Sequence, residues 1–576
     1  MERETESKSK MMLIPIAVII LSAVLRLIGL GSASLTMNES ENAMTALHLF
    51  EKGSGGQLLY SLPTAFLFRI FVSSEFTARL VPVLMGIILS VLPFLVHKKL
   101  GYGKVCLLSF LLTADPVLLF WSKRADAIIP AITILAAAAV LYMRGKKTAA
   151  LTCFLISLSG GERTWPAIAV LSICFAVSSL CLHEKFIEIR FSKRNLLIAG
   201  LFFVLFTAAF GLFPGGLNGL GEGFVNSIRL GALWVYPGVT AVIVACVLYC
   251  GIPVLFCVYS SFKDGKIPAL LLSLAAAIGL LLWHGIIMLP WITVLLWFAA
   301  SDTLLRWLNR MTGKLDFPFA MASFIVPGAY AFFYFRLVEL FKQTNGNDPV
   351  QITWNGAVQT LPLTRFGGTV LLTIISVLIL VLIIKILLGF VESESIRRGM
   401  ICGCLIVLSW GLITGIWNSG GFDREGDHPA NYHLKNTANV LNGSYTSYSK
   451  TAIFDLLSET IAKHGDKGNV NFGLNFVVND PMAEWSLRNL TGIKTTSNIH
   501  SDLAGIDLIL DRSGTSFESV GYVRTERSWR GTMDWTRLSF RDWGNWLIFG
   551  DSRMIDETPV SLWVRTDYLY SFSNLD

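Results

Sequence analysis

Long apolar runs recur along most of the chain, and they constrain its fold more than any other feature. A membrane-spanning helix needs about 20 apolar residues, with a range of about 17–25. Thirteen candidate segments approach this length, at about 11–30, 80–96, 105–121, 127–143, 148–159, 164–182, 195–213, 238–260, 268–283, 286–300, 317–338, 366–390 and 399–417. The sequence therefore predicts a polytopic, all-α membrane protein with about thirteen transmembrane helices.

The composition agrees with this and divides the chain in two. Only 15% of the residues are charged and 53% are hydrophobic, whereas soluble domains carry about 25% charged residues. Residues 1–422 contain 32 basic and 20 acidic residues, a net charge of +12, and residues 423–576 contain 15 and 20, a net charge of −5. We therefore predict a multi-spanning membrane domain over 1–422 and a water-soluble, extracytoplasmic domain over 423–576.

The distribution of lysine and arginine predicts the orientation. Positive residues favour the cytoplasmic side of a membrane protein. With the N-terminus inside, the predicted cytoplasmic segments hold 20 lysines and arginines and the opposite side holds nine. An odd number of spans then places the C-terminal domain outside the plasma membrane. A role in binding nucleic acid is excluded, because the positive-inside rule already accounts for the basic residues.

The C-terminal domain is predicted to be α/β. An amphipathic helix is expected at 451–464, where Ile453, Leu456, Leu457 and Ile461 share one face and Gly465 ends the helix. Apolar runs typical of strands lie at 470–478, 505–510, 545–549 and 561–565.

Charged residues of both signs gather on the predicted outer face. The first outer loop, about 31–79, begins with an acidic stretch that heads a predicted helix lying on or against the membrane, and short polar turns follow between later spans. Arginine and lysine can grip a lipid phosphate, while a carboxylate can remove a proton from an attacking hydroxyl. The alternative is that such loop residues are only solvated ends or interface anchors. The residues concerned are Glu39, Glu41, Lys123, Arg124, Asp126, Glu162 and Arg163.

Several sequence stretches resemble those of a known family. After the first span and the acidic pair come SEFTARLVPVLMG (74–86), WSKRADAIIPA (121–131), MLPW (288–291), HPANY (428–432), NDPMAEWSLRNL (479–490) and WVR (563–565). With these the chain resembles the GT-C glycosyltransferases, the class of protein O-mannosyltransferases and aminoarabinose transferases. Within that class it is most similar to the prokaryotic proteins associated with flippase activity in archaeal N-glycosylation.

The resemblance implies an enzyme that takes a sugar from a polyprenyl-phosphate donor and passes it to a hydroxyl of an exported lipid, glycan or protein. It implies Glu39 as general base or metal ligand, with Asp126 and Glu162 in support. Lys123 and Arg124 would hold the donor phosphate, and Arg163, Asn38 and Glu41 would complete the binding site. The sequence fixes no cofactor; a divalent cation, Mg²⁺ or Mn²⁺, is one reading that the resemblance allows.

Two departures from the family pattern keep other functions open. The family's His-Asp-Glu reads Met37-Asn38-Glu39 here, and its Glu-Lys before Met-Pro-Trp is replaced by Ile287-Met288. An amide cannot act as a base. A catalytically degenerate relative that binds or helps to deliver a lipid-linked glycan is therefore the main alternative. A secondary transporter is a weaker one, because the sequence shows no internal repeat and no pair of broken helices with charges at the membrane midplane.

The predicted topology can be tested by labelling. Cysteines introduced at Ser444 and Ser552 should react on intact cells with a thiol reagent that cannot cross the membrane, because both positions lie in the domain predicted to be outside. The unsubstituted protein gives the background from its native cysteines. Protection of both positions until the cells are lysed would contradict the odd number of spans.

Overall fold

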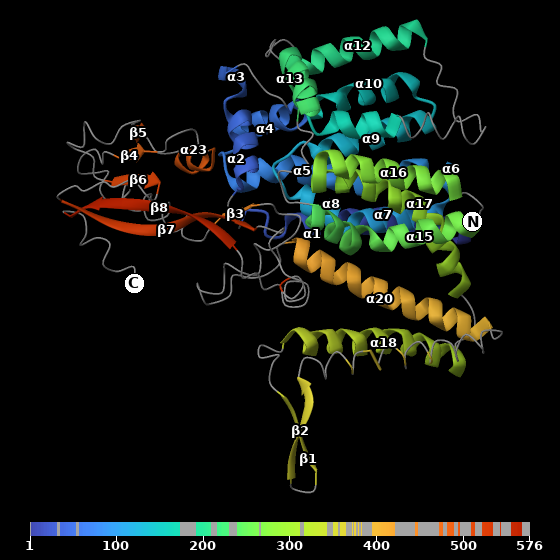
Figure 1. The fold of residues 1–576 in the computed structure, drawn as a ribbon. Helices are drawn as coiled ribbons and strands as arrows, with labels where there is room; N and C mark the ends of the chain where they lie inside the picture. Colours follow the sequence, from blue (N-terminus) through green and yellow to red (C-terminus); the bar gives the residue numbers. More distant parts are fainter. Residues whose placement is uncertain are drawn as a thin grey trace.

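The computed structural model describes residues 2–31, 35–52, 57–172, 192–208, 216–229, 239–263, 267–311, 316–342, 349–354, 357–364, 394–420, 444–446, 472–475, 481–488, 493–495, 508–512, 521–533 and 555–566, with the single positions 371, 374, 375, 378, 382 and 542. Most of these residues are helical, and the helices form one body with a β-rich part at one end (Figure 1).

The helical body is built from segments that the apolar pattern predicts. Its main helices are α1 (Glu2–Leu27), α5 (Glu75–Val91), α7 (Tyr102–Ala114), α8 (Pro116–Ser122), α9 (Ile128–Met143), α10 (Lys147–Ser157), α12 (Lys193–Thr207), α14 (Val239–Ala245), α15 (Gly251–Lys263), α16 (Ile267–His284), α17 (Leu289–Met311), α18 (Phe317–Lys342) and α20 (Glu394–Gly420). In Figure 1, α5, α7, α9, α15 and α17 run alongside one another. Below them α18 pairs with α20, and α20 in turn packs against α8 and α17.

Five helical stretches of the described residues are long and apolar enough to cross a membrane, and six if the bent pair α7–α8 counts as one span. Four shorter apolar helices accompany them, at Leu13–Leu27, Leu58–Ile70, Ile128–Met143 and Lys147–Gly160. These helices fit a multi-pass membrane protein. The count of thirteen stays a prediction, because most of the segment at 366–390 and much of 164–182 lie outside the described residues.

The first outer loop folds into three helices, α2 (Met37–Leu47), α3 (Leu49–Lys52) and α4 (Leu58–Ile70). The helix expected after the acidic stretch is thus present. On its apolar side Ala43 and Ala46 have no exposed surface, Met44 and Leu47 are half-buried, and α2 packs on α4. The loop is therefore packed into the helical body.

The described part of the C-terminal region contains a mixed sheet. Its strands are β3 (Ser444–Thr446), β4 (Phe472–Asn475), β5 (Ile493–Thr495), β6 (Leu508–Arg512), β7 (Tyr522–Met533) and β8 (Ile555–Arg565), in the order β3-β7-β8-β6-β4-β5. β4 runs parallel to β5 and β6, and the other pairs are antiparallel. A helix, α23 (Pro481–Leu487), follows β4. The structure also has a hairpin of β1 (Pro349–Trp354) and β2 (Ala357–Thr364) that the sequence analysis did not anticipate.

Three of the predicted strands coincide with observed ones: β4 lies within 470–478, β6 overlaps 505–510, and β8 contains 561–565. The predicted strand at 545–549 and the helix at 451–464 lie outside the described residues. β7 was missed because its sequence, YVRTERSWRGTM, is mostly polar and has no apolar run. An independently folded domain over 423–576 remains a prediction.

A break between α7 and α8 brings the chain's next outer turn into place. The two helices meet at 58°. Pro116 cannot supply the amide hydrogen that a continuous helix needs, and the Asp115 side chain caps the new helix by accepting from the Leu118 amide at 2.7 Å. The second Asp115 oxygen accepts from the indole of Trp297 at 2.7 Å, which ties the break to α17.

Gly86 of α5 makes room for a buried arginine near this break. Arg26 has no exposed surface, and its guanidinium donates to the Ser22 hydroxyl at 2.6 Å and to the Leu112 carbonyl at 3.3 Å. A Cβ at position 86 would lie 2.7 Å from the Nε of Arg26 and 2.9 Å from the Cβ of Ser122. Glycine is therefore required at position 86 by the close approach of two other helices.

Gly86→Ala should destabilise the protein by about 1–3 kcal/mol, because an added methyl group overpacks this contact. Gly200→Ala in α12 is the matched control: its Cβ would meet no atom within 4 Å, so alanine should be neutral or slightly stabilising. Thermal unfolding of the two purified variants in detergent measures the difference. Equal melting temperatures would show that Arg26 and Ser122 relax without cost.

Candidate functional site

Glu39 lies at the start of α2, where the local sequence closes a capping box. The Thr36 backbone amide and hydroxyl donate to one Glu39 oxygen, at 3.0 and 2.9 Å. A Thr followed three residues later by Glu is a typical helix start, because the glutamate satisfies an amide that the helix leaves unpaired. The carboxylate is thereby turned back toward the helical body, and only 3% of the residue is exposed.

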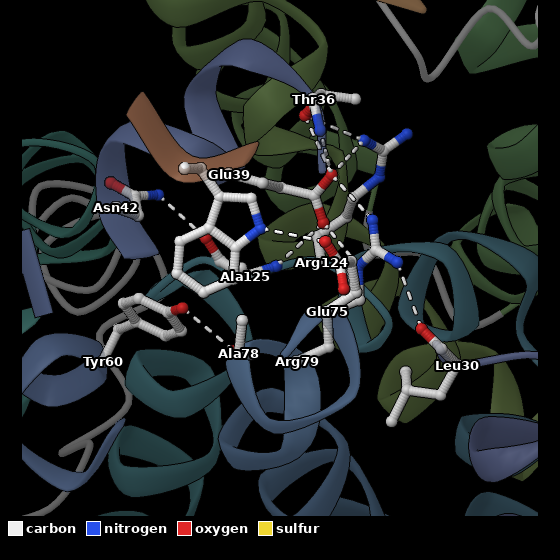
Figure 2. A network of polar contacts seen from close by, with 11 residues as sticks. Leu30, Thr36, Glu39, Asn42, Tyr60, Glu75, Ala78, Arg79, Arg124 and Ala125 are labelled. Carbon is white, nitrogen blue, oxygen red and sulfur yellow. Dashed lines mark hydrogen bonds and ion pairs between the residues drawn. The ribbon is translucent and has the colours of Figure 1, made fainter. Parts of the chain in front are cut away.

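Two arginines from other elements converge on Glu39 (Figure 2). Arg79 of α5 donates through Nε to one oxygen at 2.9 Å and through Nη2 to the other at 3.2 Å. Arg124, just after α8, donates to the second oxygen at 3.0 Å. The backbone amide of Ala125 adds a further bond at 3.1 Å. Glu39 therefore joins α2, α5 and the turn after α8.

This environment fixes the charge of Glu39. Burial alone would raise the pKa of its carboxyl group, but the charges of Arg79 and Arg124 and the hydrogen bonds from Arg79 and Thr36 outweigh burial and hold the pKa well below its usual range. A carboxylate in this state is a weak proton acceptor. The geometry thus favours a positioning role for Glu39 over the general-base role that the family resemblance implies.

The turn at 123–127 is held from several sides. The Asn42 amide donates to the Ala125 carbonyl at 2.9 Å, and the Ala127 amide donates to the Gln57 side chain at 3.3 Å. Lys123 donates to the Ile28 carbonyl at 2.7 Å, at the end of the first helix. The guanidinium of Arg124 also lies over the Phe120 ring, 4.6 Å from its centre. The polar turn is therefore held in place by contacts with the segments around it.

A second group of charges lies beside the first. Arg163 pairs with Asp126, and its Nε lies 3.8 Å from the Glu162 carboxylate. The Asp126 carboxylate also accepts from the Ile128 amide at 3.1 Å. Burial raises the pKa of both Asp126 and Glu162, against the opposing effect of Arg163. Of the two, the Glu162 side chain is the more accessible, with 25% exposed against 5% for Asp126.

Lys123 lies in a cationic environment. Burial, together with the nearby charges of Arg26 and Arg79, lowers the pKa of Lys123 to about 8. A bound anion relieves the repulsion among cations that are held at fixed positions. It binds most strongly when the lysine is protonated. This group of cations can therefore attract an anion such as a phosphate.

The structure thus brings together six of the seven charged residues that the sequence analysis selected, and it places the seventh, Glu41, and the uncharged Asn38 on the exposed side of α2. Ile287 and Met288 lie in a short 3-10 helix before α17, where Met288 is fully buried. Sequence reasoning missed the role of Arg79 as the main partner of Glu39. The only signal was its presence in the stretch 74–86.

The described residues fit a metal ion poorly. No group of three His, Cys, Asp or Glu side chains within the described part of the chain has the arrangement to hold one. The Glu39 oxygens accept hydrogen bonds from two arginines and two backbone amides. Those of Asp126 are engaged by Arg163 and by the Ile128 amide. Both carboxylates would have to give up these partners to coordinate a cation.

Comparisons with known proteins find similarity to solved structures alone. No protein-family model matches the chain, and no curated protein does. Among solved structures it is similar to ArnT from Cupriavidus metallidurans, in crystal structures of the apo state and of a complex with undecaprenyl phosphate. Each alignment has 12% identity and covers 86% of this chain and 87% of the other, with TM-scores of 0.47 for the apo state and 0.46 for the complex.

The cationic environment of Lys123 predicts pH-dependent anion binding. The lysine is protonated below its pKa of about 8 and loses its charge above it. The affinity for a lipid phosphate should therefore fall between pH 7.5 and 9.5, by up to about tenfold per unit once the pH exceeds the pKa. Titration calorimetry or fluorescence with undecaprenyl phosphate in detergent measures this.

Lys123→Arg is the matched control, because an arginine stays charged throughout this range and should flatten the profile. A wild-type affinity that does not change from pH 7.5 to 9.5 would contradict the assignment of Lys123.

Proposed function

We propose that the protein is an integral membrane glycosyltransferase, which moves a sugar from a polyprenyl-phosphate donor to a hydroxyl group of an exported lipid, glycan or protein at the outer face of the plasma membrane. The observation that carries the proposal is the juxtaposition of two unlike groups. The cations Lys123, Arg79 and Arg26 lie near one another. Two carboxylates of raised pKa lie close by: Asp126 is in the same turn as Lys123, and Glu162 lies beside Arg163, the partner of Asp126.

The cations suit the leaving group of such a reaction. As the bond between the sugar and the phosphate breaks, negative charge builds up on the phosphate oxygens. Positive groups held in place beforehand stabilise this charge without reorganising. Lys123 is the main candidate for direct contact, with Arg124 and Arg163 as further ligands. Arg79 contributes its charge from within the ion pair with Glu39.

Glu162 is our candidate for the general base. A base works best when its pKa lies near the working pH, and burial raises the pKa of Glu162 from its ordinary value. In the proposed step, the acceptor oxygen bonds to the anomeric carbon of the sugar and the bond from that carbon to the donor phosphate breaks. The acceptor proton passes to Glu162, and the polyprenyl phosphate leaves. Asp126 would orient Arg163 beside this base.

No step of this scheme passes through a divalent cation, because the carboxylates that would hold it are engaged by arginines. Asn38 and Glu41, which lie on the exposed side of α2, are proposed to contact the acceptor or the sugar. Glu39 is proposed to act indirectly, by fixing Arg79 and Arg124.

The contacts of Glu39 also favour a second function. Its oxygens are occupied by arginines, and the neighbouring position carries an amide, Asn38, where the resemblance implies an acid. These features suit a protein that binds a lipid-linked glycan and helps to deliver it without chemistry. Measurement of transfer and of binding on the same preparation separates the two functions.

Glu162→Gln should reduce the transfer rate by about 10²–10⁴-fold while binding of the polyprenyl phosphate and the melting temperature stay near the wild-type values. Glu39→Gln should instead destabilise the protein, by about 3–5 kcal/mol, because it leaves two buried arginines without their counter-charge. Glu51→Gln, an exposed change in α3, is the control for both. The assay is transfer from a panel of radiolabelled lipid-linked sugars.

Full activity of Glu162→Gln would move the base to Asp126 or to another group. Should the wild-type protein bind the lipid-linked sugars but transfer none of them, the delivery function replaces the enzyme.

A further inference from the structure

The short helix α23 of the C-terminal region packs against the first outer loop, far from it in sequence. α23 lies beside α2 in Figure 1, between the sheet and the helical body. Two of its apolar side chains, Met482 and Trp485, are each only 1% exposed. Trp485 belongs to the same apolar core as Ala43 and Ala46 of α2. The tryptophan is therefore inserted into the membrane domain.

Polar contacts fix this insertion at the junction of α4 and α5. The Trp485 indole donates to a Glu75 oxygen at 3.0 Å, and its ring lies 5.7 Å from that of Phe68. Arg488 donates to the Ser73 carbonyl at 2.6 Å and to the Ser73 hydroxyl at 3.2 Å. The guanidinium of Arg488 also covers the indole, 3.7 Å from its centre.

Two of the residues that receive these contacts lie at the start of the helix that carries Arg79: Glu75 is in its first turn, and Ser73 directly precedes its cap. Ser74 caps α5, its hydroxyl accepting from the Thr77 amide at 3.2 Å, and Glu75 is the first residue of the helix. Arg79 follows Glu75 by four residues, so the two lie on the same helix face. Figure 2 shows them together, with Arg79 reaching Glu39. A shift of this turn would therefore move Arg79.

A second buried tryptophan of the C-terminal region, Trp563, can be compared with Trp485. Trp563 of β8 is 7% exposed, and Arg524 of the neighbouring strand β7 covers it at 5.4 Å. These contacts lie within the sheet, as expected for a residue that stabilises its own fold. Trp485 has its contacts on α4 and α5 instead, which points to a role in the membrane domain.

We infer that Trp485 and Arg488 are positioning residues of the outer-face site: by docking α23 on the first turn of α5, they hold Arg79 and, through it, Glu39 and the phosphate-binding turn. The effect on sugar transfer rests on the function proposed above. The effect on the order of α5 does not, because it follows from the contacts alone.

The experiment uses the full-length protein in detergent and three changes that remove a contact: Trp485→Phe, which keeps an aromatic ring but loses the indole donor, Glu75→Met, which loses the acceptor, and Arg488→Ala. Glu75→Gln is the conservative variant, since its amide oxygen can still accept from the indole. Glu484→Ala is the matched control, because Glu484 lies on the exposed side of α23.

Amide hydrogen exchange over residues 73–79 is the first readout. It should be faster in the three disrupting variants and unchanged in Glu484→Ala and Glu75→Gln. Loss of one such hydrogen bond corresponds to about a fivefold change. Trp485→Phe and Glu75→Met should be non-additive when combined, because they remove the same bond. Unchanged exchange in all three disrupting variants would overturn the inference.

Binding of undecaprenyl phosphate and sugar transfer are the second readout. The disrupting variants should weaken both by a similar factor, whereas Glu484→Ala should not. Faster exchange with no binding of the lipid in any variant, the wild type included, would leave α23 as a positioning element and refute the proposed function. Faster exchange with wild-type binding and transfer would refute the coupling of α23 to the site.

Discussion

The arrangement of the candidate site depends on one buried carboxylate. Glu39 joins the start of α2, the first turns of α5 and the turn after α8, segments that are separated by 40 to 86 residues along the chain. Burying charges is unfavourable unless each is paired and hydrogen-bonded, so a site of this kind is stable only when all its members are present. The three segments are therefore held in one arrangement, and every charged residue proposed to act on a ligand is positioned relative to it.

The charge balance around this carboxylate explains how a structural ion pair can support a binding site. Glu39 faces two arginines at once, and the charges of Arg26 and Arg79, alongside burial, lower the pKa of Lys123. A bound phosphate would favour the charged form of this lysine. On the other side of the turn, Asp126 and Glu162 share Arg163, and burial favours their protonated forms. On one side of this short turn the cations favour a bound anion. On the other side the buried carboxylates favour a bound proton.

The sequence predicts those parts of this arrangement that depend on local pattern. Long apolar runs mark the helices, and charges in the predicted outer loops mark Arg124, Asp126, Glu162 and Arg163 as neighbours of one functional face. Roles that depend on long-range pairing were not accessible. Whether Glu39 is free to accept a proton is decided by Arg79, which lies 40 residues away in a stretch that reads as the start of a span. Likewise β7, a polar strand, is defined by its pairing with β8 rather than by its own pattern.

The stretch NDPMAEWSLRNL illustrates how a motif can be informative without taking part in chemistry. Its residues contain no acid–base cluster. In the structure, an aromatic and a cationic side chain of this stretch meet the end of a loop and the first turn of a membrane helix. Such a contact constrains both partners, because the indole needs an acceptor where it is buried and the helix start needs its cap. The buried indole of Trp485 and the start of α5 therefore depend on each other, although they are 410 residues apart. A change in either should alter the position of Arg79.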